Sequence, residues 1–99
     1  MSKFPKKPKD FFYYQSQVLK SEVYFIREEY EKAVNILLKI EEEKPKDFIF
    51  DYVLYKIGQC YEKMGKSNNA LTYYQKLQND YPQSFYALNA SQKIRYLLK

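Results

Sequence analysis

The stretch DYVLYKIGQCYEKMGKSNNALTYYQKLQNDYPQS, residues 51–84, decides the fold of this 99-residue chain. Its apolar residues recur every three or four positions on both sides of Gly65, which predicts two helices joined by a tight turn over residues 64–67. Because Gly58 has no side chain, we expect the first helix to lie close to Ala70 of the second. Two rings should wedge this pair from either side, those of Tyr61 and Tyr74. Pro82 cannot continue a helix and should end the second one.

The same unit recurs along the chain. A four-residue marker begins at Pro8, Pro45 and Pro82: Pro, then a polar residue, then Asp or Ser, then Phe. The markers are evenly spaced, since 45 − 8 and 82 − 45 both equal 37. Three further pairs share this interval: Ala33 and Ala70, Tyr24 and Tyr61, and Leu37 and Tyr74. In each marker Pro breaks a helix, Asp or Ser caps the next one, and Phe begins its apolar face. We therefore predict an internal repeat with a longer link and an extra first turn before each odd-numbered helix.

The repeat predicts an all-α fold, a right-handed solenoid of five antiparallel helices in two and a half repeats. A basic, proline-containing tail covers residues 1–9, and a single helical domain covers residues 10–99. We expect helices over residues 11–27, 30–43, 48–64, 68–79 and 85–98. The expected caps are Asp10, Asp47 and Ser67. The first helix should bury Phe11, Tyr14, Val18, Ser21 and Phe25, in a stripe widened by Leu19, Val23 and Ile26.

The formal charge of +5 is concentrated before the first helix, where four lysines stand at positions 3, 6, 7 and 9. The remaining body carries +5 − 4 = +1, so we expect no nucleic-acid partner; weak RNA binding stays a third hypothesis. The tail is either a solvated leader or a membrane-proximal arm. A single cysteine excludes an internal disulfide. No apolar run approaches the ~18 residues of a membrane span.

The residue types for catalysis are missing. The chain has no histidine, and it has no glycine-rich phosphate loop and no Ser or Cys with a base at a suitable spacing. Cys60 lies one turn from Lys56, and we interpret it as a packing residue. The acidic run over residues 41–43 is interpreted as a solvated helix end because neighbouring helical residues point in different directions. We expect no enzyme activity, catalytic residue, cofactor or metal.

The order of residues in 51–84 resembles the tetratricopeptide repeat: Leu54, Ile57, Gly58, Tyr61, Gly65, Ala70, Tyr74 and Pro82. In such stacks the odd-numbered helices line the concave face. The resemblance therefore implies a partner-binding groove lined by Gln15, Glu22, Tyr52, Tyr55, Lys56, Gln59, Lys63, Asn89, Gln92, Lys93 and Tyr96. Rings and amides there suit an extended peptide. The alternative for the two tyrosines of the third helix is that they pack between units.

The last helix has no partner after it. Its residues Ile94, Leu97 and Leu98 are predicted to form an exposed terminal edge. Two interpretations stay open. The helix is the cap of the array, or its apolar edge meets another chain or a second copy of this one.

Within the superfamily, the chain resembles outer-membrane assembly lipoproteins of the BamD type and the periplasmic Tol-Pal coordinator. The matching segments are residues 80–87 (DYPQSFYA) with Ala90, residues 69–77 (NALTYYQKL), and residues 29–34 (EYEKAV). The resemblance implies a non-catalytic periplasmic scaffold at the outer membrane, lipidated on an N-terminal cysteine. Its implied partner is a β-barrel assembly subunit or an unfolded outer-membrane protein segment. This chain lacks that cysteine and carries fewer repeats than the family's usual five or so. A cytosolic adaptor is the alternative.

Overall fold

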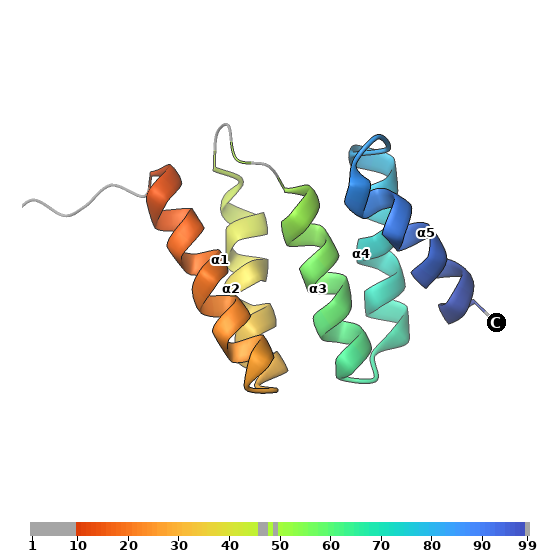
Figure 1. Cartoon of the computed structure of the whole chain (residues 1–99), viewed down its shortest axis with the longest axis horizontal. Coiled ribbons are helices and arrows are strands. Elements are labelled where there is room, and N and C mark those ends of the chain that lie inside the picture. Colours follow the sequence, from red (N-terminus) through yellow and green to blue (C-terminus); the bar gives the residue numbers. More distant parts are fainter. Residues whose placement is uncertain (1–9, 46–47, 49, 99) are drawn as a thin grey trace, which may run out of the picture.

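The computed structural model describes residues 10–45, 48 and 50–98, and helices are the only regular elements in that part of the chain. They are α1 (Phe11–Ile26), α2 (Tyr30–Glu43), α3 (Asp51–Lys63), α4 (Ser67–Asp80) and α5 (Phe85–Leu97). Each helix packs on the next one in sequence, and they line up in chain order from α1 at one end to α5 at the other (Figure 1). The fold is a tetratricopeptide-like helical solenoid, as predicted. No helix within the described ranges has the length and apolar character needed to cross a membrane.

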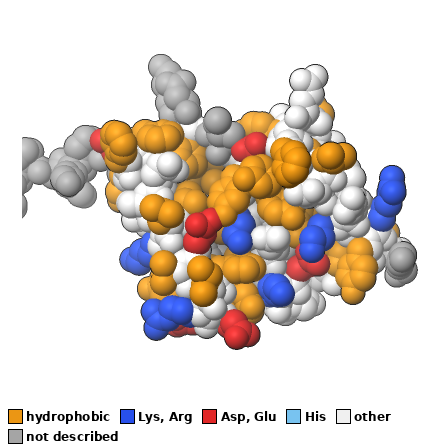
Figure 2. Space-filling view, in the orientation of Figure 1, with side chains coloured by type: hydrophobic (Ala, Val, Ile, Leu, Met, Phe, Trp, Pro, Cys, Tyr) orange, Lys and Arg blue, Asp and Glu red, His pale blue; other side chains and the backbone are white. Residues whose placement is uncertain are grey.

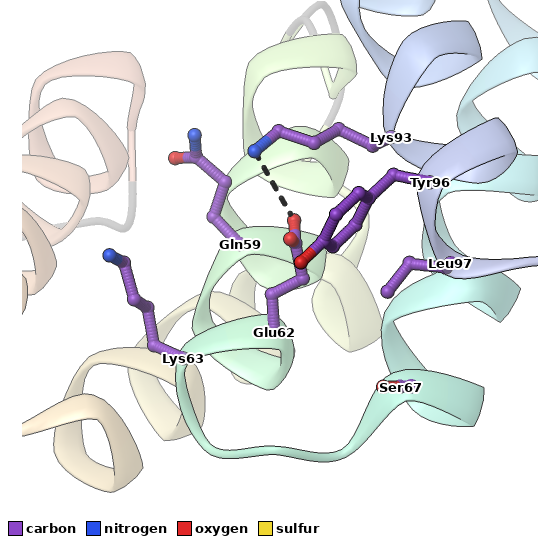
Figure 3. A pocket seen from close by; sticks show the side chains of 7 residues that line it. All are labelled: Gln59, Glu62, Lys63, Ser67, Lys93, Tyr96 and Leu97. Carbon is purple, nitrogen blue, oxygen red and sulfur yellow. Dashed lines mark ion pairs between the residues drawn. The ribbon is translucent and has the colours of Figure 1, made fainter. Parts of the chain in front are cut away.

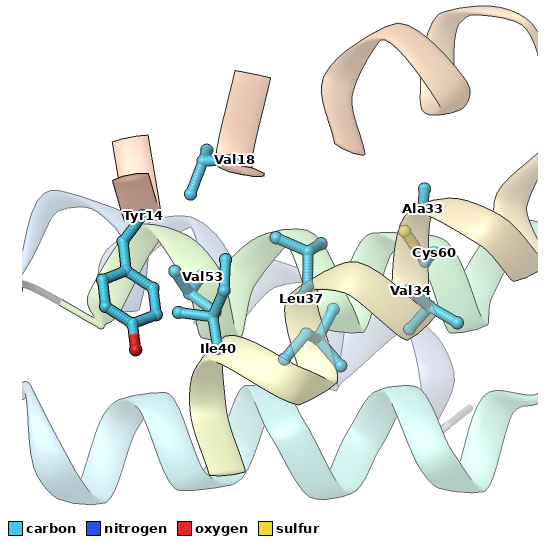
Figure 4. Close-up of a cluster of buried hydrophobic side chains, with 9 residues drawn as sticks. Tyr14, Val18, Ala33, Val34, Leu37, Ile40, Val53 and Cys60 are labelled. Atoms are coloured by element: carbon cyan, nitrogen blue, oxygen red, sulfur yellow. The ribbon is translucent and has the colours of Figure 1, made fainter. Parts of the chain in front are cut away.

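Two apolar clusters hold the stack together. The first joins α1, α2 and α3 through Tyr14, Val18, Ala33, Val34, Leu37, Ile40, Val53, Ile57 and Cys60 (Figure 4). The second joins α3, α4 and α5 through Leu54, Ala70, Tyr74, Leu77, Ala87 and Ala90. Because α3 contributes to both clusters, it is the central element of the molecule. The expected repeat positions Ala33 and Ala70 are both fully buried.

The predicted buried stripe of α1 is too wide. Tyr14, Val18 and Ser21 are buried as expected, and Phe25 is half-buried. Four other members of the predicted stripe are exposed: Phe11, Leu19, Val23 and Ile26. The physical reason is that α1 stands at the end of the array and packs mainly on α2. One neighbour covers only one face of a helix.

Of the predicted longer link and extra first turn, the structure shows the longer link before α3 but no extra turn at the start of α3. Helix α3 begins at Asp51, not at Phe48, so the start-to-start offset from α3 to α5 is 85 − 51 = 34. The ends of α1 and α3 are 63 − 26 = 37 apart. The additional length therefore belongs to the link between α2 and α3. There the ring of Phe48 contacts those of Phe11 and Tyr14, with centroids 5.9 and 5.8 Å apart, instead of starting a helix.

The predicted caps have mixed outcomes. The Asp10 carboxylate accepts a hydrogen bond from the Tyr13 amide at 3.0 Å, and the Ser84 hydroxyl accepts one from the Tyr86 amide at 3.1 Å. The prediction for Ser67 was wrong: Ser67 is the first residue of α4, and Lys66 precedes it without a side-chain cap. Asp47 lies outside the described residues. Helix α4 ends at Asp80, two residues before Pro82, as proline chemistry requires.

Candidate functional site

Helices α1, α3 and α5 share one face of the molecule, and this face is hollowed in two places. Figure 2 shows that face, with hydrophobic side chains gathered towards the end where these helices begin and most of the charged ones towards the other end. Helix α3 contributes to this difference, because Tyr52 and Val53 stand near its beginning and Glu62 and Lys63 at its end. One face of the stack therefore presents two chemically different surfaces.

The first surface, called here the apolar hollow, lies between the beginnings of α1 and α3. It has a volume of about 340 Å³ and is lined by Phe11, Gln15, Val18, Phe48, Asp51, Tyr52 and Val53. Two predicted groove residues, Gln15 and Tyr52, are among them. Sequence reasoning missed Phe48 because it was assigned to the first turn of a helix, although its aromatic character was the available signal.

The second surface, called here the polar hollow, lies between the ends of α3 and α5. It has a volume of about 370 Å³ and is lined by Gln59, Glu62, Lys63, Ser67, Lys93, Tyr96 and Leu97 (Figure 3). Four predicted groove residues come together there: Gln59, Lys63, Lys93 and Tyr96. Glu62 was missed, because the predicted groove was one stripe of α3 and Glu62 lies at its edge.

Charge in the polar hollow is only partly balanced. Lys93 of α5 reaches Glu62 of α3, with Nζ 3.6 Å from Oε1 (Figure 3). The same Glu62 oxygen accepts a hydrogen bond from the Tyr74 hydroxyl at 2.5 Å. Lys63 is exposed and has no ion-pair partner among residues 10–45, 48 and 50–98. The polar hollow thus carries two cations against one anion, a balance that favours a negatively charged ligand group.

The two predicted groove tyrosines of α3 pack between repeat units. The Tyr86 ring of α5 lies 5.1 Å from Tyr52 and 5.4 Å from Tyr55, centroid to centroid. The Tyr52 hydroxyl also donates a hydrogen bond to the carboxylate of Glu22 on α1. Tyr52 therefore links all three helices of this face and still lines the apolar hollow, whereas Tyr55 fits the inter-unit packing alternative.

Lys56 is held by an aromatic ring. Its Nζ lies 3.7 Å from the centroid of the Phe25 ring, a cation–π contact between α3 and α1. Burial lowers the pKa of this lysine, an effect opposed by the charges of Cys60 and Glu22. Lys56 thus packs against α1 and lines neither hollow, and its charge is less available to a partner than that of Lys63.

The remaining predicted residues lie on α5. Asn89 is half-buried and Gln92 is exposed, and neither lines the two hollows described above. In the predicted terminal edge, Leu98 is 64% exposed. Ile94 and Leu97 are half-buried and pack against the second apolar cluster. The inward packing of these two residues leaves little of that edge to another chain.

The described residues offer neither a reactive thiol nor a metal-binding cluster. Cys60 is fully buried, and burial raises the pKa of its thiol to about 11, although the Lys56 charge opposes that shift. Such a thiol is a poor nucleophile at neutral pH. No group of three or more His, Cys, Asp or Glu that could hold a metal ion occurs within the part of the chain that the structure describes.

Comparison with known proteins gives one family. Residues 52–84 match the model of the tetratricopeptide repeat, and this span covers α3, α4 and the link to α5. No curated protein and no solved structure matches the chain. Repeats of this family generally form non-catalytic scaffolds that bind other proteins. The match thus supports a tetratricopeptide repeat within residues 52–84 and indicates a role in protein–protein interaction.

Proposed function

We propose that this protein is a non-catalytic scaffold that binds an extended segment of a partner protein along the shared face of α1, α3 and α5. The observation that carries the proposal is the presence of two chemically distinct hollows on that one face. A flat or uniformly polar face would offer neither shape nor charge selectivity. An apolar side chain fits the hollow lined by Phe11, Phe48 and Tyr52, and an acidic one fits the hollow beside Lys63 and Lys93.

The spacing of the hollows sets the length of the recognised segment. Tyr52 and Lys63 are 63 − 52 = 11 residues apart on α3, which is about 16 Å of helix. An extended chain covers that distance in about five residues. The partner segment should therefore carry a large apolar residue and an acidic residue about five positions apart. Amide side chains at Gln15 and Gln59 are placed to bond its backbone.

A random peptide library displayed on phage tests this function. Selection on the wild-type protein should enrich peptides with the apolar-to-acidic spacing. Lys63→Glu should weaken binding of those peptides by about tenfold or more, because an attraction becomes a repulsion. The matched control is Lys39→Glu, which makes the same charge change at an exposed lysine of α2. Equal effects of the two substitutions, or no enrichment at all, would remove the proposal.

A narrower hypothesis places the scaffold in outer-membrane protein assembly, as a periplasmic relative of the BamD type. What supports it is the segment over residues 80–87. Its Ser84 caps α5 and donates a hydrogen bond to the Asp51 carboxylate at 2.7 Å, so this segment sets how α5 meets α3. A cytosolic adaptor of the same fold is the alternative.

Affinity pull-down from the native membrane fraction distinguishes the periplasmic scaffold from the cytosolic adaptor. The natural protein, tagged at its C-terminus, should recover a β-barrel assembly subunit, and replacement of Tyr52, Lys56 and Gln59 by Ala should reduce that recovery. Fractionation and N-terminal sequencing of the native protein should place it in the periplasm. Recovery of cytosolic chaperones would instead support the adaptor.

A further inference from the structure

One face of α1 is apolar and open to solvent. Phe12, Leu19, Val23 and Ile26 are 76%, 61%, 52% and 79% exposed. At about 100° of rotation per residue, the four side chains fall within an arc of about 60°. They extend over 26 − 12 = 14 residues, or about 21 Å. We call these four residues the α1 stripe. Gln15 and Ser16 separate Phe12 from the other three members of the stripe. Isolated exposed apolar residues are ordinary on protein surfaces, but several of them along one helix face mark a contact surface.

The corresponding positions of α3 are covered only in part. Val23 of the stripe stands 60 − 23 = 37 residues before Cys60, and Cys60 is fully buried in the cluster that includes α2. On α1 that position is more than half exposed, because α2 packs on a different face of the helix. Leu19 and Ile26 stand 37 residues before Lys56 and Lys63, which are half-buried and exposed. The apolar character of these two positions is therefore particular to α1, and no described element covers the α1 stripe.

The charges around the α1 stripe are distributed unevenly. Four lysines, at positions 3, 6, 7 and 9, precede the stripe in sequence. Lys20 and Arg27 follow one of its borders. Arg27 is paired with Glu29, with Nε and Oε2 3.2 Å apart. On the opposite border the one acid, Glu22, accepts a hydrogen bond from Tyr52. Cations therefore predominate in the sequence before the α1 stripe and along one of its sides.

We propose that the α1 stripe lies in the interface of an anionic lipid bilayer, and that the charge of the four lysines preceding it in sequence adds to the attraction. An amphipathic helix with aromatic and aliphatic residues on one face and cations at its border binds such surfaces by apolar burial and charge attraction. Each lysine near an anionic surface adds to the attraction. A flat protein partner would need acidic residues at matching positions, whereas a lipid surface supplies negative charge everywhere. This proposal stands apart from peptide binding, because the stripe does not line either hollow.

The exposed apolar residues of α5 are arranged differently. Phe85, Leu88 and Tyr96 are 72%, 64% and 68% exposed, but Gln92 and Arg95 interrupt their surface. No lysine cluster adjoins the beginning of α5. Helix α5 therefore provides matched control positions with similar exposure and without a neighbouring lysine cluster.

Co-sedimentation with vesicles tests the proposal on the full chain. The protein should bind vesicles of phosphatidylglycerol mixed with phosphatidylcholine, should lose affinity as salt is raised, and should not bind phosphatidylcholine alone. The double substitution Leu19→Glu and Ile26→Glu should reduce binding by about tenfold or more. The control, Leu88→Glu, should leave it unchanged. Circular dichroism checks that each variant is folded.

Tryptophan fluorescence gives a second readout, because the chain has no tryptophan. Phe12→Trp should show a blue-shifted emission when anionic vesicles are added, whereas Phe85→Trp should not. The proposal is overturned if vesicles do not bind, or if the double variant binds as well as the wild type, which would assign binding to the basic segment alone. It is also overturned if the double substitution instead abolishes self-association seen by analytical ultracentrifugation in the absence of lipid.

Discussion

The ring of Tyr74 lies directly against Gly58, so that a Cβ atom at position 58 would come within 2.8 Å of three ring atoms. Tyr74 is fully buried, and its hydroxyl donates a hydrogen bond to Glu62. The sequence suggested that Gly58 makes room for Ala70. The structure shows that the atoms nearest to this missing side chain belong to Tyr74. The glycine thus permits an aromatic ring in the core between α3 and α4.

Gly58→Ala should destabilise the protein by about 1–3 kcal/mol, because the added methyl group overlaps a ring that has no free space to enter. Urea denaturation followed by circular dichroism measures the change. An unchanged midpoint would show that the helices separate without cost and that the contact is not tight.

The first repeat suggests how this contact can be relieved. Position 58 corresponds to Ser21 and position 74 to Leu37, since both pairs are 37 residues apart and all of these residues are buried. The double substitution Gly58→Ser and Tyr74→Leu should therefore cost less than the sum of the two single substitutions. A thermodynamic cycle measures this coupling, which should be at least about 0.5 kcal/mol. Strict additivity would mean that the two positions do not interact.

The turn between α1 and α2 and the turn between α3 and α4 share one backbone geometry but differ in residue type. Glu28 has φ +63° and Gly65 has φ +75°, and the positions are 65 − 28 = 37 residues apart. A left-handed conformation costs a residue with a Cβ roughly 1–2 kcal/mol relative to glycine. Glu28→Gly should therefore raise the stability by about 0.5–1 kcal/mol, the entropy of the unfolded chain offsetting part of the gain. Gly65→Ala should lower it by about 1 kcal/mol. Thermal melts of both variants check these opposite signs, and two shifts of the same sign would contradict the shared geometry.

Local sequence chemistry predicted the helices and the caps at Asp10 and Ser84 because each depends on a few neighbouring residues. The start of α3 was harder to predict. The Pro–Lys–Asp–Phe marker before it matches the others, but Phe48 packs against Phe11 and Tyr14 of α1, a contact that local pattern does not contain. The same limit applies to burial along α1, where helical periodicity identifies an apolar face but not which part of it a neighbour covers.

The candidate site shows a similar division. Helical spacing placed Gln59 and Lys63 on one side of α3, and the structure brings them together with Lys93 of α5. The packing of Tyr55 against Tyr86, and of Lys56 over the Phe25 ring, depends on distances between helices. The pattern of a single helix does not contain those distances. Sequence alone could therefore not distinguish Tyr55 and Lys56 from the predicted groove residues that line the hollows.

Cys60 should react very slowly with alkylating agents. Burial raises the pKa of its thiol to about 11 from an ordinary value of 9.0, so 11 − 9.0 = 2 corresponds to about 100-fold less thiolate at pH 8. Iodoacetamide labelling followed by mass spectrometry should show at least that ratio between the urea-unfolded and the folded protein. Similar rates in both states would place the thiol at the surface.

The same shift predicts a loss of stability at alkaline pH. A folded-state pKa above the unfolded value means that the folded form holds its proton more tightly, so this contribution is complete below pH 9.0 and falls as the pH rises towards about 11. Replacement of Cys60 by Ala should make the stability less dependent on pH in that window. An unchanged alkaline slope would assign the dependence to other groups.

Site-specific photo-crosslinking in the native cells tests the proposed partner-binding face most directly. A benzophenone amino acid at Gln59, in the polar hollow, is compared with the same residue at Gln75, which is exposed on α4. We predict a discrete protein adduct from position 59 whose crosslinked peptide carries an acidic residue, with no such adduct from position 75 and a loss of the adduct on Lys63→Glu. Adducts from position 75 alone, or an adduct at position 59 that Lys63→Glu leaves unchanged, would contradict binding along the face of α1, α3 and α5.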